Sequence, residues 1–116
     1  MIALTLPWPP SVNRIWRQYA GRVLLSREGR AYRQAVLGAW LQARQQGMGR
    51  QPIKLVIDAH MPDARRRDLD NLNKAALDAM QAARVFEDDS QVVDLHIRRA
   101  GIDRTNPRLE ITLEAA

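Results

Sequence analysis

Hydrophobic and polar residues alternate in four segments of the chain, and this period of two predicts β-strands. The four segments are residues 2–6, 53–60, 91–99 and 108–114. The first strand ends at "PWPP", and residues 11–26 after it predict a loop or a short hairpin around Gly21. Residues 100–107 predict a hairpin-like connection between the last two strands.

Two other segments space their apolar residues as an α-helix does. The first follows Ser26, a favourable N-cap, and we expect it to end near Gly47. The second covers residues 68–83, and its core face comprises Leu69, Leu72, Ala76, Ala79, Met80 and Ala83. The resulting order β-α-β-α-β-β predicts a mixed α/β fold: a small four-stranded mixed sheet with two packed helices. Residues 1–116 are expected to form one domain.

The second helix carries charged residues on the side opposite its apolar face. Asp70, Lys74 and Asp78 recur every four residues, and Asp68 stands where an N-cap belongs. A purely structural interpretation of these residues is available. Asp68 then caps the helix, Asp70 and Lys74 form an exposed ion pair, and Asp88-Asp89 is a polar turn.

Charge is unevenly distributed in this chain of net charge +5. Residues 1–67 carry twelve basic and three acidic groups, a net +9, whereas residues 68–94 carry two and seven, a net −5. The basic part suits a polyanion such as nucleic acid. Sixteen arginines against two lysines favour paired contacts to phosphate, although genomic base composition also favours arginine.

The absence of cysteine excludes disulfides and thiolate metal sites, and it suits the reducing cytoplasm. The N-terminus does not resemble a signal peptide, and no segment approaches the roughly 20 apolar residues of a membrane span. We therefore expect a cytoplasmic protein without a membrane partner.

Two acidic pairs flank the second helix: Asp68 with Asp70, and Asp88 with Asp89. If the strands before and after this helix are neighbours, the spacing permits the pairs to converge without requiring it. Converging carboxylates tolerate one another around a divalent cation, and hard oxygen ligands favour Mg²⁺ or Mn²⁺ over zinc. The arginine block 65–67 would draw in the phosphate backbone that such a metal helps to cut.

Four stretches of the chain resemble the RusA family of Holliday junction resolvases, and the resemblance spans nearly the whole sequence. They are "TLPWPPSVNRIWR", "HMPDARRRDLDNLNKAALDA", "EDDSQVVDLHIRR" and "RLEITLE". The resemblance implies a small dimeric endonuclease, often prophage-encoded, that resolves four-way DNA junctions in recombination and repair. Its paired symmetric nicks leave 5′-phosphate and 3′-hydroxyl ends. One departure from the family pattern is Arg84, where a glycine is expected.

The resemblance also implies roles for particular residues. Asp68, Asp70 and Asp89 match the essential acidic residues that bind Mg²⁺, and Lys74 matches a functional lysine. Lys74 then orients the attacking water or offsets charge on the leaving oxygen, unless it serves only as an ion-pair partner. Asp88 is either an outer contact of the metal site or a turn residue. The basic patch of the family corresponds to Arg65, Arg66 and Arg67.

A second group of candidate DNA contacts follows the Pro-Pro corner: Asn13, Arg14 and Arg17, for which a plain surface loop is the alternative. The expected partners are branched DNA and a second copy of the chain, with no small-molecule cofactor. Two other functions remain open. One is a nucleic-acid-binding module without catalysis, and the other is a nuclease specific for flaps or forks.

Overall fold

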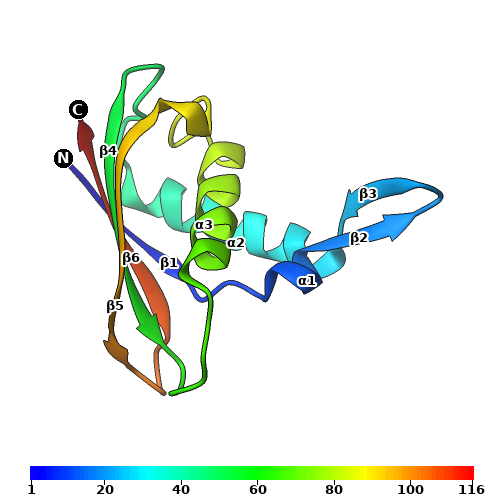
Figure 1. The fold of residues 1–116 in the computed structure, drawn as a ribbon. Helices are drawn as coiled ribbons and strands as arrows, with labels where there is room; N and C mark the ends of the chain where they lie inside the picture. The colour runs from blue at the N-terminus through cyan, green and yellow to red at the C-terminus, as the bar shows by residue number, and fades with distance from the viewer.

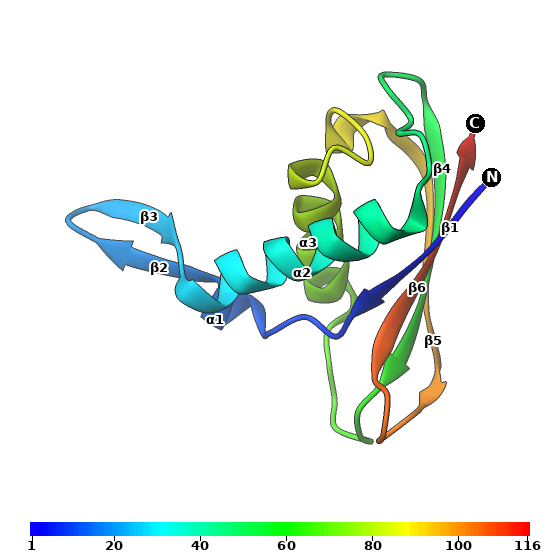
Figure 2. The ribbon, with the colours of Figure 1, turned by 180° about the vertical axis from the view of Figure 1, so that it is seen from behind.

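The protein is built on a four-stranded mixed sheet, seen in a computed structural model that describes residues 1–116 apart from the side chain of Val12. The strands lie in the order β1-β6-β4-β5, and they are β1 (Ile2–Pro7), β4 (Ile53–Met61), β5 (Val92–Ile102) and β6 (Arg108–Ala115). Helices α2 (Arg27–Ala43) and α3 (Leu69–Ala82) lie on the same side of this sheet (Figures 1 and 2). The predicted mixed sheet with two packed helices is confirmed.

Strand β4 has a parallel neighbour, β5, and an antiparallel neighbour, β6. Strand β6 also pairs antiparallel with β1. The predicted hairpin-like connection at residues 100–107 is therefore wrong, because β4 lies between β5 and β6. The connection instead passes the end of β4, where the Asp103 amide donates a hydrogen bond of 2.8 Å to the Met61 carbonyl.

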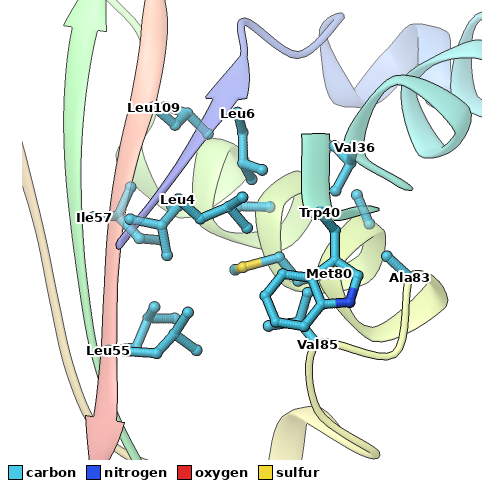
Figure 3. Packing of buried hydrophobic residues seen from close by; sticks show 14 of the residues in the cluster. Leu4, Leu6, Val36, Trp40, Leu55, Ile57, Met80, Ala83, Val85 and Leu109 are labelled. Carbon is cyan, nitrogen blue, oxygen red and sulfur yellow. The ribbon is translucent and has the colours of Figure 1, made fainter. Parts of the chain in front are cut away.

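The hydrophobic core fills the space between the sheet and the two helices (Figure 3). Alternate residues of β4 are buried, as the period of two predicted, and Val36 and Trp40 of α2 meet Met80 of α3 over them. Burying each Val, Leu, Ile or Met side chain of this core stabilises the fold by about 1.5–3 kcal/mol. Within the described part of the chain, no helix is long and apolar enough to cross a membrane.

Helix α2 begins where the sequence predicted and ends earlier. The Ser26 hydroxyl oxygen accepts a hydrogen bond of 3.0 Å from the Gly29 amide, so Ser26 is the expected N-cap. The helix ends at Ala43, and Arg44, not Gly47, takes the left-handed conformation (φ 52°). Gly47 serves close packing instead: a Cβ there would lie 2.9 Å from the Arg84 carbonyl oxygen.

Residues 11–26 form a projecting hairpin, one of the two outcomes that the sequence allowed. A single helical turn, α1 (Val12–Ile15), leads into β2 (Trp16–Tyr19), which pairs with β3 (Arg22–Leu25). The turn between them is Ala20-Gly21, and both residues have positive φ, 51° and 74°. Such turns match the twist of a two-stranded ribbon. The hairpin extends away from the sheet and helices (Figure 1).

Helix α3 ends at Ala82, and the left-handed residue that follows its cap is not glycine. Arg84 has φ 65°, and the Val85 amide donates to the Met80 carbonyl at 3.0 Å, which closes the last turn. The departure from the family pattern therefore changes the residue and keeps the turn. A residue that has a Cβ is sterically strained in this conformation, and the strain lowers the stability of the fold.

Replacing Arg84 with glycine is expected to raise the free energy of unfolding by about 1 kcal/mol, because glycine adopts this φ without a steric clash. Urea unfolding followed by circular dichroism measures the change. Arg84→Ala is the matched control: it also removes the guanidinium but keeps the Cβ, so its stability should stay within about 0.5 kcal/mol of the parent. Equal stabilisation by both variants would mean that charge, not backbone strain, is responsible.

Candidate functional site

The N-terminal end of α3 presents two carboxylates. Asp68 caps the helix, and its Oδ1 accepts a hydrogen bond of 2.9 Å from the Asp70 amide. Asp70 lies in the first turn, where its Oδ2 is 3.4 Å from the Lys74 Nζ, and both of these side chains are 65% exposed. The helix dipole places about half a positive charge at this end, which favours carboxylates there. The structural roles expected of all three residues are therefore present.

The other acidic pair belongs to the turn η1 (Asp89–Gln91). Asp88 caps this turn by accepting hydrogen bonds from the hydroxyl and the amide of Ser90, and these bonds, that of the hydroxyl first, lower the pKa of the Asp88 carboxyl. The Asp89 amide donates to Gln81 Oε1 at 3.0 Å, and the Asp89 side chain is exposed. The carboxylate of Asp88 is thus engaged in capping the turn, while the side chain of Asp89 faces solvent.

The structure places the two acidic pairs at opposite ends of α3. Gln81, the neighbour of Asp89, follows Asp70 by eleven residues, and a rise of about 1.5 Å per residue separates them by roughly 16 Å along the helix. Across the described residues, no group of three Asp, Glu or His side chains is close enough to hold a metal ion. Asp68 and Asp70 therefore do not meet Asp89 within one chain.

Strand direction explains this separation. Because β4 and β5 are parallel, α3 must return the chain to the end of the sheet where β4 began. Figure 1 shows α3 rising from the lower connection after β4 to the upper turn before β5. The sequence allowed convergence only if a return loop undid the length of the helix, and the chain has no such loop.

An open groove of about 1020 Å³ borders the Asp68 end of α3. Arg14 of α1 lines this groove, and so do Arg65, Arg66 and Arg67 from the segment before α3. Two separately predicted DNA-contacting segments therefore meet in one groove. Asn13 and Arg17 lie outside its lining and are exposed on α1 and β2.

The three arginines of the block differ in their surroundings. Arg67 donates hydrogen bonds of 2.6 and 3.1 Å to the two carboxylate oxygens of Asp63, and its guanidinium lies 5.7 Å from the centre of the Trp8 ring. This pairing, together with a hydrogen bond from the Arg65 amide, lowers the pKa of Asp63 to about 2. Arg65 and Arg66 are exposed. Arg67 therefore fixes the segment against Trp8, whereas Arg65 and Arg66 extend from it.

Sequence reasoning missed two residues that support this region. Arg33 of α2 donates two hydrogen bonds, of 3.0 and 2.8 Å, to the Asp78 carboxylate of α3 and so joins the two helices. Trp8 forms the support under Arg67. Neither contact has a signal in the sequence, because the partners lie 45 and 59 positions apart.

The amino-acid sequence was compared with protein-family models and with known proteins, and both comparisons find the same family. The family model described as Endodeoxyribonuclease RusA matches residues 7–114. A protein of Shigella sonnei named Crossover junction endodeoxyribonuclease RusA is 46% identical over 111 residues, which cover 96% of this chain and 92% of that protein. The protein of that name from Escherichia coli K12 gives the same values. The corresponding protein of Enterobacteria phage 82 is 46% identical over 114 residues, 95% of this chain and 91% of its own.

Arg67→Gln is expected to return the pKa of Asp63 toward its usual value near 3.8, because Arg67 is the largest cause of the lowering. A lowered pKa stabilises the fold at pH values above 3.8, and that contribution is lost as the pH falls toward 2. Carboxyl ¹³C NMR titration measures the midpoint. Arg66→Gln, a neighbouring change of equal charge, should leave it near 2; equal shifts in both variants would rule out the specific pair.

Proposed function

The chain belongs to the RusA endodeoxyribonuclease family, and we propose that it cleaves four-way DNA junctions by metal-dependent hydrolysis of the phosphodiester backbone. The observation that carries the proposal is the position of Asp68 and Asp70. They stand at the end of α3 that borders a groove lined by Arg14 and the 65–67 block. A cationic groove beside a carboxylate pair is what backbone cleavage needs: phosphate is held by one and a metal by the other.

The donor set fits a hard divalent cation. Asp68 and Asp70 offer carboxylate oxygens, and the chain contains no cysteine, so Mg²⁺, or Mn²⁺ in its place, suits the site better than zinc. When bound, the cation supplies Lewis-acid polarisation of the phosphate and a lowered pKa for a coordinated water. Arg65 and Arg66 hold the backbone, and Lys74 offsets charge on the leaving oxygen.

We infer that the third carboxylate comes from a second chain. Asp89 lies at the far end of α3 from Asp70, and both are exposed. In a two-fold dimer, Asp89 of the partner subunit completes the site formed by Asp68 and Asp70. The symmetry then generates two equal sites, as paired symmetric nicks across a junction require. This dimer acts on branched DNA in the cytoplasm.

Two alternatives make different predictions. In a binding module without catalysis, Asp68 serves only as a cap and Asp70 only as the partner of Lys74, and both of these contacts are present. In a flap or fork nuclease the same residues act on another branched substrate. Cleavage of a four-way junction compared with flap, fork and linear duplex, each with and without Mg²⁺, separates the three functions.

Asp70→Asn is expected to lower the rate of junction cleavage in Mg²⁺ by at least about 100-fold, because an amide is a poor ligand for the metal. Binding of the uncut junction in EDTA should be retained or strengthened, since a negative charge near the phosphates is removed. Gel-based cleavage and fluorescence anisotropy measure the two effects.

Glu114→Gln is the control for Asp70→Asn. It makes the same change of acid to amide on β6, where Glu114 pairs with Lys54 at 3.8 Å on the face of the sheet that the helices leave uncovered. This variant should cleave at the parental rate. An Asp70→Asn protein that also cleaves at the parental rate would exclude Asp70 as a ligand.

A further inference from the structure

We propose that the β2–β3 hairpin is an arm that binds the backbone of one duplex arm of the junction. This inference rests on the proposed function, because it takes branched DNA as the substrate. It goes further by assigning a DNA contact to an element outside the groove and by including Tyr19 and Arg22, which sequence reasoning did not select.

The hairpin is exposed on both of its faces. Tyr19 is 67% exposed and Val23 is 63% exposed, and every residue of β2 is exposed. Figures 1 and 2 show it extending beyond the sheet and both helices. A two-stranded hairpin alone is marginally stable in water. An exposed ribbon of this kind is therefore expected to gain order from a bound partner.

One face of the hairpin is basic and aromatic. The register pairs Arg17 with Leu24 and Tyr19 with Arg22, so these four side chains share a face. The Arg17 guanidinium lies 5.9 Å from the centre of the Tyr19 ring. Between residues 12 and 27 the chain has four arginines and no acidic residue. Charge complementarity therefore favours a polyanion such as the DNA backbone as the partner of this face.

The basic face of the hairpin is separate from its more apolar face. Tyr19 and Val23 lie on opposite faces, because Val23 pairs with Gln18 on the face that Arg17 and Tyr19 do not occupy. A stable protein interface buries about 800 Å² on each partner and has an apolar centre. The face with Val23 also carries Trp16 and Leu25, so a contact with a second copy would use that face. The basic face is left for DNA, and the width of the ribbon suits a DNA groove.

The root of the arm is held against the helix that carries Asp70. The Ser26 amide donates to the Ile15 carbonyl at 2.8 Å, which closes the base of the hairpin. The Arg33 guanidinium lies 5.9 Å from the centre of the Trp16 ring and pairs with Asp78 of α3. DNA bound along the arm is thereby oriented relative to α3. Arg14, immediately before the arm, lines the groove beside Asp68 and continues the basic surface toward the carboxylates.

The test replaces both basic residues of this face, Arg17→Gln with Arg22→Gln. Junction affinity is measured by anisotropy in EDTA, over a range of salt concentrations. Each lost phosphate contact reduces the magnitude of the slope of log affinity against log salt concentration by about 0.9. The double variant should therefore have a slope smaller in magnitude by about 2, and it should bind more weakly at every salt concentration. Arg44→Gln, which neutralises an exposed arginine after α2, should change the slope by less than 1.

Three outcomes decide the matter. A double variant with the parental slope and affinity contradicts the proposal that the hairpin binds DNA. A double variant that sediments as a monomer while the parent sediments as a dimer also overturns it, because the hairpin then contacts a second copy. A lower slope with an unchanged assembly state supports it. These results are independent of cleavage: a parent that binds junctions through the arm but never cuts them in Mg²⁺ or Mn²⁺ contradicts the proposed function alone.

Discussion

The parallel pairing of β4 with β5 determines where the other parts of the site lie. A parallel pair needs a crossover, and here α3 carries the chain back along the sheet. One end of α3 therefore bears Asp68 and Asp70, and the other end leads to Asp89. Core packing fixes this arrangement, because Ala76 and Met80 of α3 are fully buried. Sliding the helix by one turn would put Ala76 where Met80 packs, and the cavity left by the smaller side chain would cost about 2–5 kcal/mol.

In the proposed shared site, each end of α3 supplies part of the carboxylate set. Two-fold symmetry is the simplest way to bring unlike ends together, because it places each end of one copy against the other end of its partner. The dependence on assembly has a functional advantage for a junction nuclease. Under the proposed sharing, a lone chain would lack a complete site, and cutting would be confined to a dimer that presents two sites to the branched DNA at once.

The sequence predicted the features that depend on local order. Alternation in residues 53–60 gave β4 because one face of that strand is buried, and Ser26 and Asp68 were identified as caps by the hydrogen bonds that their side chains make nearby. Strand direction has no such local signal. Residues 91–99 alternate in the same way whether β5 runs parallel or antiparallel to β4. The connection at 100–107 was therefore misjudged, and the sequence left open whether the two acidic pairs meet within one chain. The contact of Arg67 with Trp8 likewise depends on the folded chain.

The most direct test of a site shared between chains is to mix two inactive variants. When Asp70→Asn and Asp89→Asn are co-expressed, a heterodimer with shared sites contains one doubly altered site and one intact site. We expect Mg²⁺-dependent nicking of one strand at the junction to return, whereas each variant alone is inactive. A mixture of Asp68→Asn with Asp70→Asn has no intact site and should stay inactive. If the first mixture is as inactive as the second, Asp89 does not complete the site of its partner, and the shared site is contradicted.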